Sequence, residues 1–381
     1  MKTRIEFANT LRGIAACLVL AEHYTGFFRG SRQVIASISN TPVLSETAVP
    51  GPPYLAHLQI SHFSSSSFGV ALFFLISGFV IPLSLRDTGV RAFAISRIFR
   101  ILPTYLVGFS ITLLALLAAS WFYGRDFPYS ARDVAVHYFV PLRQIFGTAY
   151  IDYIIWTLEI EVDFYLMCAI AIALFRRASP LVFLIPIVIG VSSIALCASA
   201  PQGTPIFDRA NDFSYILVLN SKYLIFMFIG VVFNFHYRSS IGTGQLLAWI
   251  AGLYTLFALT WHFNIQKALF QMIWSYAAAV LTFGAAYRWR GLFKPNLVTS
   301  FLADISYPLY VVHGIAGYVF MRLLFETSIP QWVVLPLTIA VFFSIAWLVH
   351  RYVEAPSQRF GKEISARSAN RQAGMQYSSQ Q

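Results

Sequence analysis

Residues 66–85 read SSFGVALFFLISGFVIPLSL, twenty residues without a charged side chain. A stretch of this length and hydrophobicity is what an α-helix needs to cross the hydrocarbon core of a bilayer. The whole chain has the same character, because 57% of its 381 residues are hydrophobic and only 11% are charged, against roughly a quarter in soluble domains. The composition therefore predicts an integral membrane protein and leaves no soluble domain of useful size.

Working outward from this stretch, windows of about twenty residues predict about ten membrane spans. They lie near residues 7–28, 66–85, 101–123, 150–175, 180–199, 214–237, 245–262, 268–287, 298–324 and 330–350. We expect an all-α fold, a polytopic membrane helical bundle. An even number of spans places both termini on one side of the membrane.

The positive charges indicate which side that is. With Arg12 and Lys222 set aside as intramembrane residues, 17 of the 27 Lys and Arg residues fall on the side of the termini and 8 on the other. Cytoplasmic loops carry the excess of Lys and Arg, so both termini are predicted to be cytoplasmic. We expect a membrane domain over residues 1–360, followed by a basic, disordered tail over residues 361–381.

Two ionisable residues, Arg12 and His23, lie inside the first predicted span. They are eleven residues apart, which on an α-helix places them on one face and about 16 Å apart along the axis. Two interpretations are open. Either the arginine reaches the interface and a neighbouring helix satisfies the histidine, or the pair faces a polar cavity and is functional.

Arg97 and Arg100 precede the apolar part of the third span. At i and i+3 on a helical turn, two guanidinium groups can point the same way and grip one polyphosphate. The other interpretation is that they anchor the cytoplasmic end of the span.

Two further polar groups fall within predicted spans. Glu159, Glu161 and Asp163 alternate along the fourth span, and i, i+2 residues diverge around a helix, so at least one of them should face a polar cavity. The alternative is a structural partnership with Arg12, Lys222 or Asn220. In the ninth span Ser306, Tyr310 and His313 have the i, i+4, i+7 spacing of a polar stripe.

Six motifs follow one another along the chain. They are Arg12 with His23; the segment FFLISGFVI at residues 73–81; Arg97-x-x-Arg100-Ile101-x-Pro103-x-Tyr105; Trp156-x-Leu158-x-x-Glu161 followed by Phe164-Tyr165; Tyr307 to His313; and Val353-Glu354-Ala355-Pro356. The same motifs occur in this order in the membrane acyltransferase-3 family, which the chain resembles from about residue 5 to 360.

The resemblance implies a set of roles. It makes His23 the catalytic base, Arg12 its motif partner, Glu161 the family's acidic residue, and Arg97 and Arg100 contacts of the acyl-CoA phosphates. We expect the substrate cavity to include Tyr105, Trp156, Asp163, Tyr310 and His313, and we expect no metal. The chain departs from the family pattern at Glu22, before the histidine, and at Asp163, where Gln or Glu is more usual.

The function that the resemblance implies is transfer of an acyl group, typically acetyl, from acyl-CoA to a hydroxyl. The expected acceptor is a carbohydrate, glycolipid or natural product, not nucleic acid, and the expected location is the bacterial inner membrane. Glu161 would orient the His23 imidazole or stabilise its cation. His23 as base would serve direct transfer, whereas His23 as nucleophile would give an acyl-imidazole, and both remain open. The alternative function is a transporter or flippase, although no internal inverted repeat is evident.

Overall fold

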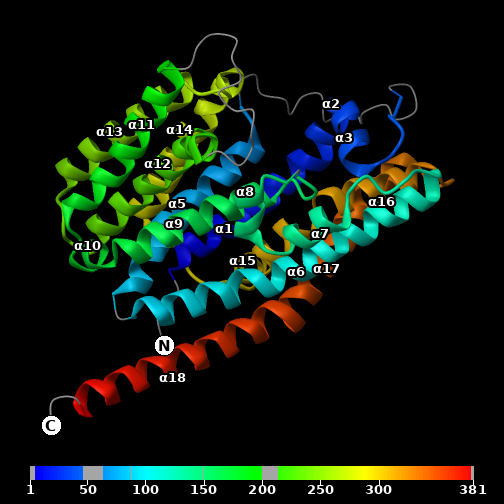
Figure 1. Ribbon diagram of the computed structural model, residues 1–381. Coiled ribbons are helices and arrows are strands. Elements are labelled where there is room, and N and C mark those ends of the chain that lie inside the picture. Colours follow the sequence, from blue (N-terminus) through cyan, green and yellow to red (C-terminus); the bar gives the residue numbers. More distant parts are fainter. Residues whose placement is uncertain (1–4, 46–62, 87, 149, 200–212, 379–381) are drawn as a thin grey trace.

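The computed structural model describes residues 5–45, 63–86, 88–148, 150–199 and 213–378, and within these residues it contains helices and no strands (Figure 1). The helices are α1 (Glu6–Glu22), η1 (His23–Phe27), α2 (Phe28–Gly30), α3 (Arg32–Ser39), α5 (Ser65–Leu85), α6 (Val90–Tyr123), α7 (Ala131–His137), α8 (Val140–Phe146), α9 (Ile155–Ile170), α10 (Ile172–Arg177), η2 (Pro180–Phe183), α11 (Leu184–Ser199), α12 (Phe213–Tyr237), α13 (Thr243–His262), η3 (Lys267–Met272), α14 (Ile273–Arg288), η4 (Arg290–Leu292), α15 (Leu297–Val312), α16 (Ile315–Phe325), α17 (Gln331–Val349), η5 (His350–Glu354) and α18 (Ala355–Ser378). The predicted all-α class is confirmed.

Seven helical segments of the described chain are long and apolar enough to cross a membrane, or eight if one bent pair counts as a span. Each of the ten predicted spans coincides with helical structure, but α1 and α9 have only 17 and 16 residues. The predicted span 298–324 is not one straight helix, because α15 and α16 meet at a bend of 73°. The protein is thus a helical membrane protein in which the predicted span 298–324 is sharply bent.

Helices α5 and α12 form the buried centre of the bundle. Their apolar residues lie on all sides, the pattern of a helix surrounded by other helices. They cross very closely: a Cβ atom at Gly78 would lie 1.9 Å from the Met227 carbonyl oxygen, and one at Gly230 would lie 2.3 Å from that of Leu75. Small residues at such crossings let two membrane helices approach each other.

Helix α1 packs against α5 and α15, and this position directs its polar residues. Near its middle, the Nη2 of Arg12 donates a hydrogen bond to the Ala303 carbonyl of α15 at 2.7 Å. Just beyond its end, the hydroxyl of Tyr24 donates to the His313 carbonyl at 2.8 Å. The two contacts hold the first span along α15, with Arg12 and His23 at different levels.

The end of the chain differs from the prediction of a disordered tail after residue 360. Helix α17 continues through η5 into α18, which lies along α6 (Figure 1). The Ser357 hydroxyl donates to the Phe99 carbonyl at 3.0 Å, and that of Ser365 to the Ala92 carbonyl at 3.1 Å. These contacts join serine hydroxyls to backbone carbonyls. Such contacts do not require apolar residues at helical spacing, so the sequence of the tail did not reveal the packing. Residues 379–381 lie outside the described part.

Candidate active site

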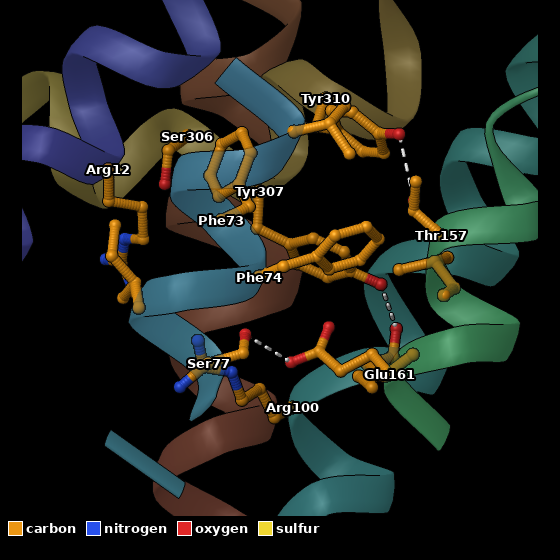
Figure 2. Close-up of a pocket in the computed structure, with 14 residues that line it drawn as sticks. Arg12, Phe73, Phe74, Ser77, Arg100, Thr157, Glu161, Ser306, Tyr307 and Tyr310 are labelled. Carbon is orange, nitrogen blue, oxygen red and sulfur yellow. Dashed lines mark hydrogen bonds between the residues drawn. The ribbon is translucent and has the colours of Figure 1, made fainter. Parts of the chain in front are cut away.

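A cavity between α1, α5, α6, α9 and α15 collects residues from five of the sequence motifs (Figure 2). It is lined by Arg12, Val70, Phe73, Phe74, Ile76, Ser77, Arg100, Ile101, Thr157, Leu158, Glu161, Ser306, Tyr307 and Tyr310. Its empty volume, counted together with the solvent space open to it, is about 710 Å³. We call it the Arg cavity.

Glu161 is the carboxylate of the Arg cavity. Its Oε1 accepts hydrogen bonds from the Tyr165 hydroxyl at 2.6 Å and from the Ser77 hydroxyl at 3.4 Å. It also interacts electrostatically with Arg100. Figure 2 shows Arg12, Arg100 and Glu161 around one cavity, with two guanidinium groups and one carboxylate. Glu354 also interacts electrostatically with Arg100. Guanidinium groups in the lining suit an anionic or strongly polar ligand.

The two arginines of the Arg97-x-x-Arg100 motif have different surroundings. Arg100 lines the Arg cavity. Arg97 donates from Nη2 to the Ser84 hydroxyl at 2.7 Å, and its guanidinium lies over the rings of Phe93 and Tyr165, at 5.1 and 5.3 Å. Both guanidinium groups act on Tyr165, but only Arg100 lines the Arg cavity.

His23 is the first residue of η1, a π-helical turn that follows α1. Such turns are rare and often occur at functional sites. Its Nε2 lies 3.4 Å from the Ser66 hydroxyl oxygen, and its Nδ1 lies 3.0 Å from Nε2 of His313. His23 faces a second cavity, with an empty volume of about 910 Å³, which we call the His23 cavity. Its other lining residues are Glu22, Phe27, Val34, Ile38, Ser64, Ser66, Ser67, Asp152, Tyr153, Ile154, Trp156, Met272, Gly314, Ile315 and Tyr318.

A third cavity adjoins the His23 cavity, since Ser66, Ser67, Tyr153, Trp156 and Met272 line both. Its empty volume is about 1020 Å³, and seven of its lining residues are aromatic. These aromatic residues are Tyr150, Tyr153, Trp156, Tyr215, Tyr223, Trp261 and Tyr276. Asn220 and Gln266 add polar groups, and the Gln266 Oε1 is buried without a hydrogen-bond partner. We call it the aromatic cavity.

One face of α5 connects the three cavities. Ser66 lines the His23 and aromatic cavities, Val70 lines the aromatic and Arg cavities, and Ser77 lines the Arg cavity. These residues are spaced at i, i+4 and i+11, so they lie on one side of the helix. The charged site around Arg12 and the imidazole of His23 thus belong to neighbouring spaces along the same helix.

The start of α5 contains residues that sequence reasoning missed. The carboxylate of Glu22 accepts hydrogen bonds from the hydroxyls of Ser64 and Ser65, each at 2.9 Å, and from the backbone N–H of Ser66. A carboxylate at a helix N-terminus satisfies its free N–H groups and its positive dipole. Glu22 therefore fixes Ser66 beside His23. The run of four serines before an apolar segment was the available signal for a helix start.

The remaining predicted site residues divide into two groups. Trp156 lines the His23 and aromatic cavities, and Tyr310 lines the Arg cavity, where its hydroxyl is 2.8 Å from that of Thr157 (Figure 2). Tyr105 and Asp163 line none of the three cavities. The Tyr105 hydroxyl donates to the His137 carbonyl at 3.1 Å, and Asp163 accepts from the Asn220 amide at 3.0 Å. Both are placed as structural groups.

Glu161, expected to orient the His23 imidazole or stabilise its cation, makes its hydrogen bonds elsewhere. Glu161 hydrogen-bonds Tyr165 and Ser77 in the Arg cavity, whereas the imidazole of His23 contacts Ser66 and His313. Glu161 diverges from Glu159 and Asp163, as their spacing predicts, and the side chain that contacts the His23 Nδ1 is His313, at the bend between α15 and α16. Within the described residues, no group of three or more His, Cys, Asp or Glu side chains could hold a metal ion.

Comparison with known proteins identifies the family of this chain. The chain is 26% identical to Nodulation protein 10 of Rhizobium leguminosarum bv. viciae over 323 residues, which cover 78% of this chain and 84% of that protein. No solved structure matches the chain significantly. The acyltransferase-3 family profile, described as an acyltransferase domain, matches residues 5–351, nearly the whole chain. The chain therefore belongs to the acyltransferase-3 family.

Proposed function

We propose that this protein transfers an acyl group from acyl-CoA to a hydroxyl of a carbohydrate or related cell-envelope acceptor, with His23 as general base. The enzyme would act in the bacterial inner membrane with both termini in the cytoplasm. The observation that carries the proposal is the position of His23: it lines a cavity, and the aromatic cavity connects that space to the Arg cavity, which holds two arginines and a carboxylate.

The donor would use the Arg cavity. Acyl-CoA carries phosphates, and guanidinium groups bind phosphate oxygens in pairs of hydrogen bonds. Arg100 would receive the anionic end, with Arg97 holding the adjoining corner of α5 and α6, and Arg12 would lie deeper along the path. The rise from Arg12 to His23 along α1, about 16 Å, is of the order that the extended arm of acyl-CoA could cover.

The acceptor would use the His23 and aromatic cavities. A sugar ring has apolar C–H faces that pack on aromatic side chains and hydroxyls that need hydrogen-bond partners. The aromatic cavity offers seven aromatic residues together with the unpartnered Oε1 of Gln266 and the amide of Asn220. Its residues Ser66 and Trp156 are shared with the His23 cavity, so an acceptor bound there can present a hydroxyl to the imidazole.

In the transfer itself, the Nε2 of His23 takes the proton of the acceptor hydroxyl as its oxygen attacks the thioester carbonyl. The C–S bond then breaks, the acyl group remains on the acceptor oxygen, and the CoA thiolate takes the proton from the His23 imidazolium, which restores the neutral base. A thioester is already activated, so a base and a positioned acceptor are the main requirements. Small acyl groups such as acetyl would fit the proposal.

The test is acyl transfer by protein in nanodiscs, supplied with radiolabelled acetyl-CoA and a cell-envelope extract. Replacing His23 with Asn should lower the rate by about 10²-fold or more, the usual contribution of a general base. His262→Asn is the matched control, because His262 is exposed at the end of α13 and lines none of the three cavities. Equal rates for the two variants would contradict the proposal, and acceptor movement without CoA release would indicate a transporter.

A further inference from the structure

The hydrogen bonds of His313 determine which of its nitrogens carries the proton. Its Nδ1 lies 3.0 Å from the Leu309 carbonyl oxygen and 2.9 Å from that of Tyr310. A carbonyl oxygen only accepts hydrogen bonds, so Nδ1 must be the donor and carry the hydrogen. In a neutral imidazole the other nitrogen, Nε2, then has a free lone pair.

The position of the hydrogen on His313 also determines the position of the hydrogen on His23, because the two rings are in contact. The His313 Nε2 accepts, so the His23 Nδ1, 3.0 Å away, must donate and carry a hydrogen. The lone pair of His23 therefore lies on Nε2. That nitrogen points to the Ser66 hydroxyl, 3.4 Å away, which can donate to it. The nitrogen that faces the cavity is thus the basic one.

We propose that His313 is a positioning residue, which holds His23 in the tautomer and orientation that a general base requires. The inference rests on the proposed function and extends it to a residue of another helix. In the familiar triad of serine proteases a carboxylate has this role. Here a neutral imidazole takes the place of the carboxylate. Two backbone carbonyls determine which nitrogen of His313 carries the hydrogen, and His313 in turn determines which nitrogen of His23 does.

The structure fixes His313 in place. It caps the end of α15 at the 73° bend before α16, and its side chain is buried. Its own carbonyl accepts from the Tyr24 hydroxyl at 2.8 Å, which ties it to the π-helical turn that carries His23. The centroids of the two imidazole rings lie 4.9 Å apart. A buried neighbour held by its own hydrogen bonds keeps a catalytic group in its productive geometry.

The same hydrogen bond between His23 and His313 is kept when His23 is protonated. When His23 takes a proton from the acceptor, both of its nitrogens become donors. The Nδ1 still donates to the His313 Nε2, so no hydrogen bond has to break and no ring has to turn. His313 therefore stays neutral throughout, and it makes no contact with the reacting atoms.

The tautomer can be read directly, without an activity assay, from ¹⁵N spectra of the histidine-labelled protein in nanodiscs at neutral pH. The His23 signals are identified by their loss in His23→Asn. We expect an unprotonated Nε2 and a protonated Nδ1 for His23. A protonated Nε2 on His23 would overturn the inference. Because the tautomer is read from the full chain without substitution, only the assignment of the signals uses a variant, and no substitution at residue 313 is needed.

Kinetics of two variants give the second test. His313→Leu removes the acceptor and should lower kcat by about 10²-fold, because an imidazole in the wrong tautomer cannot act as base. The KM for the donor should change by less than about twofold, since transition-state positioning and not donor binding is lost. His313→Gln offers an amide oxygen to the His23 Nδ1 and should recover kcat to within about tenfold of the unsubstituted protein.

Equal kcat for His313→Leu and the unsubstituted protein would contradict the positioning role, as would equal losses in the Leu and Gln variants. If the unsubstituted protein transferred no acyl group at all, the proposed function would fail. The ¹⁵N spectra would still decide the tautomer of His23 in that case. The two failures are therefore distinguishable.

Discussion

Glu161 carries the negative charge of the Arg cavity, and its neighbours allow a test of that charge alone. Glu161→Gln keeps an oxygen that can accept from Tyr165 but removes the charge that faces Arg100. Hydrogen bonds to charged groups contribute about 1.5–3 kcal/mol, so we expect the free energy of unfolding to fall by about 1–2 kcal/mol. Reversible unfolding in mixed micelles measures it. Glu363→Gln, an exposed substitution on α18, should stay within about 0.5 kcal/mol, and a similar value for both would contradict the assignment.

Arg97 and Arg100 share a motif, but their surroundings predict different effects on donor binding. Arg100→Gln should weaken coenzyme A binding by about 10–100-fold, the equivalent of one charge-assisted hydrogen bond. Arg97→Gln should weaken it by less than about threefold, because its guanidinium is engaged with Ser84 and two aromatic rings. Isothermal titration with coenzyme A in nanodiscs compares the two. The reverse order would show that Arg97 is the phosphate contact.

The acidic residues of α9 show what a sequence can predict about single side chains. Their alternate spacing predicts that Glu161 diverges from Glu159 and Asp163. In the structure Glu161 lines the Arg cavity, whereas Glu159 pairs with Arg143 and Asp163 with Asn220. The spacing of one helix cannot identify partners from other helices, because those depend on packing. For this reason the sequence left Asn220 as one of several candidate partners of the acidic residues. For the same reason it suggested Glu161 as the residue that orients His23, whereas the ring of His23 contacts His313.

Among the elements, the crossing of α5 and α12 is the one most sensitive to a single methyl group. A Cβ atom at Gly78 meets backbone oxygen at 1.9 Å, and a backbone cannot move aside as a flexible side chain can. Gly78→Ala should therefore force the helices apart and lower the free energy of unfolding by about 1–3 kcal/mol, the usual cost of overpacking. Loss of thermal stability in detergent measures this effect.

Gly252 provides the matched control for that substitution. It lies inside α13, and nothing lies within 4 Å of where its Cβ would be. Gly252→Ala should leave stability unchanged or raise it by up to about 1 kcal/mol, because alanine favours helix. If Gly78→Ala behaved like Gly252→Ala, the close crossing of α5 and α12 would be wrong.

The long helices could be predicted from hydrophobicity, but their interruptions could not. Continuous apolar runs gave the positions of α5, α12 and α17 within a few residues. The π-helical turn at His23 and the bend at His313 fall inside predicted spans, at the ends of the two packed helices α1 and α15. These two irregular points are also where the two imidazoles meet. Local sequence reasoning fails there because tertiary packing at the site outweighs helical propensity.

For the whole molecule, composition determined the class and the motif order determined the family. An all-helical bundle follows from a chain too apolar for water, since helices satisfy every backbone group within lipid. The number of complete spans depends on how α1, α9 and the bent pair of α15 and α16 sit in the bilayer. The lengths of these helices alone do not decide whether each crosses the membrane, so the count of ten spans remains a prediction.

The membrane orientation can be tested from the ends of α6. Its 34 residues extend about 50 Å, well beyond a hydrocarbon core of about 30 Å, so its two ends lie on opposite sides of the membrane. One end contacts α18 through Ser357 and Ser365, and the other contacts Asn40, which follows α3, through Ser120. The excess of Lys and Arg predicts that the α18 side is cytoplasmic.

Single cysteines on the two sides give the measurement, in a background where Cys17, Cys168 and Cys197 are replaced by serine. Arg132→Cys lies on the same side as Asn40, and Lys294→Cys lies before α15 on the opposite side; both positions are exposed. In intact spheroplasts an impermeant maleimide should label the first and leave the second unlabelled until the membrane is permeabilised. The opposite pattern would reverse the orientation and place the donor site on the wrong side for cytoplasmic acyl-CoA, so this labelling tests topology and the proposed direction of transfer together.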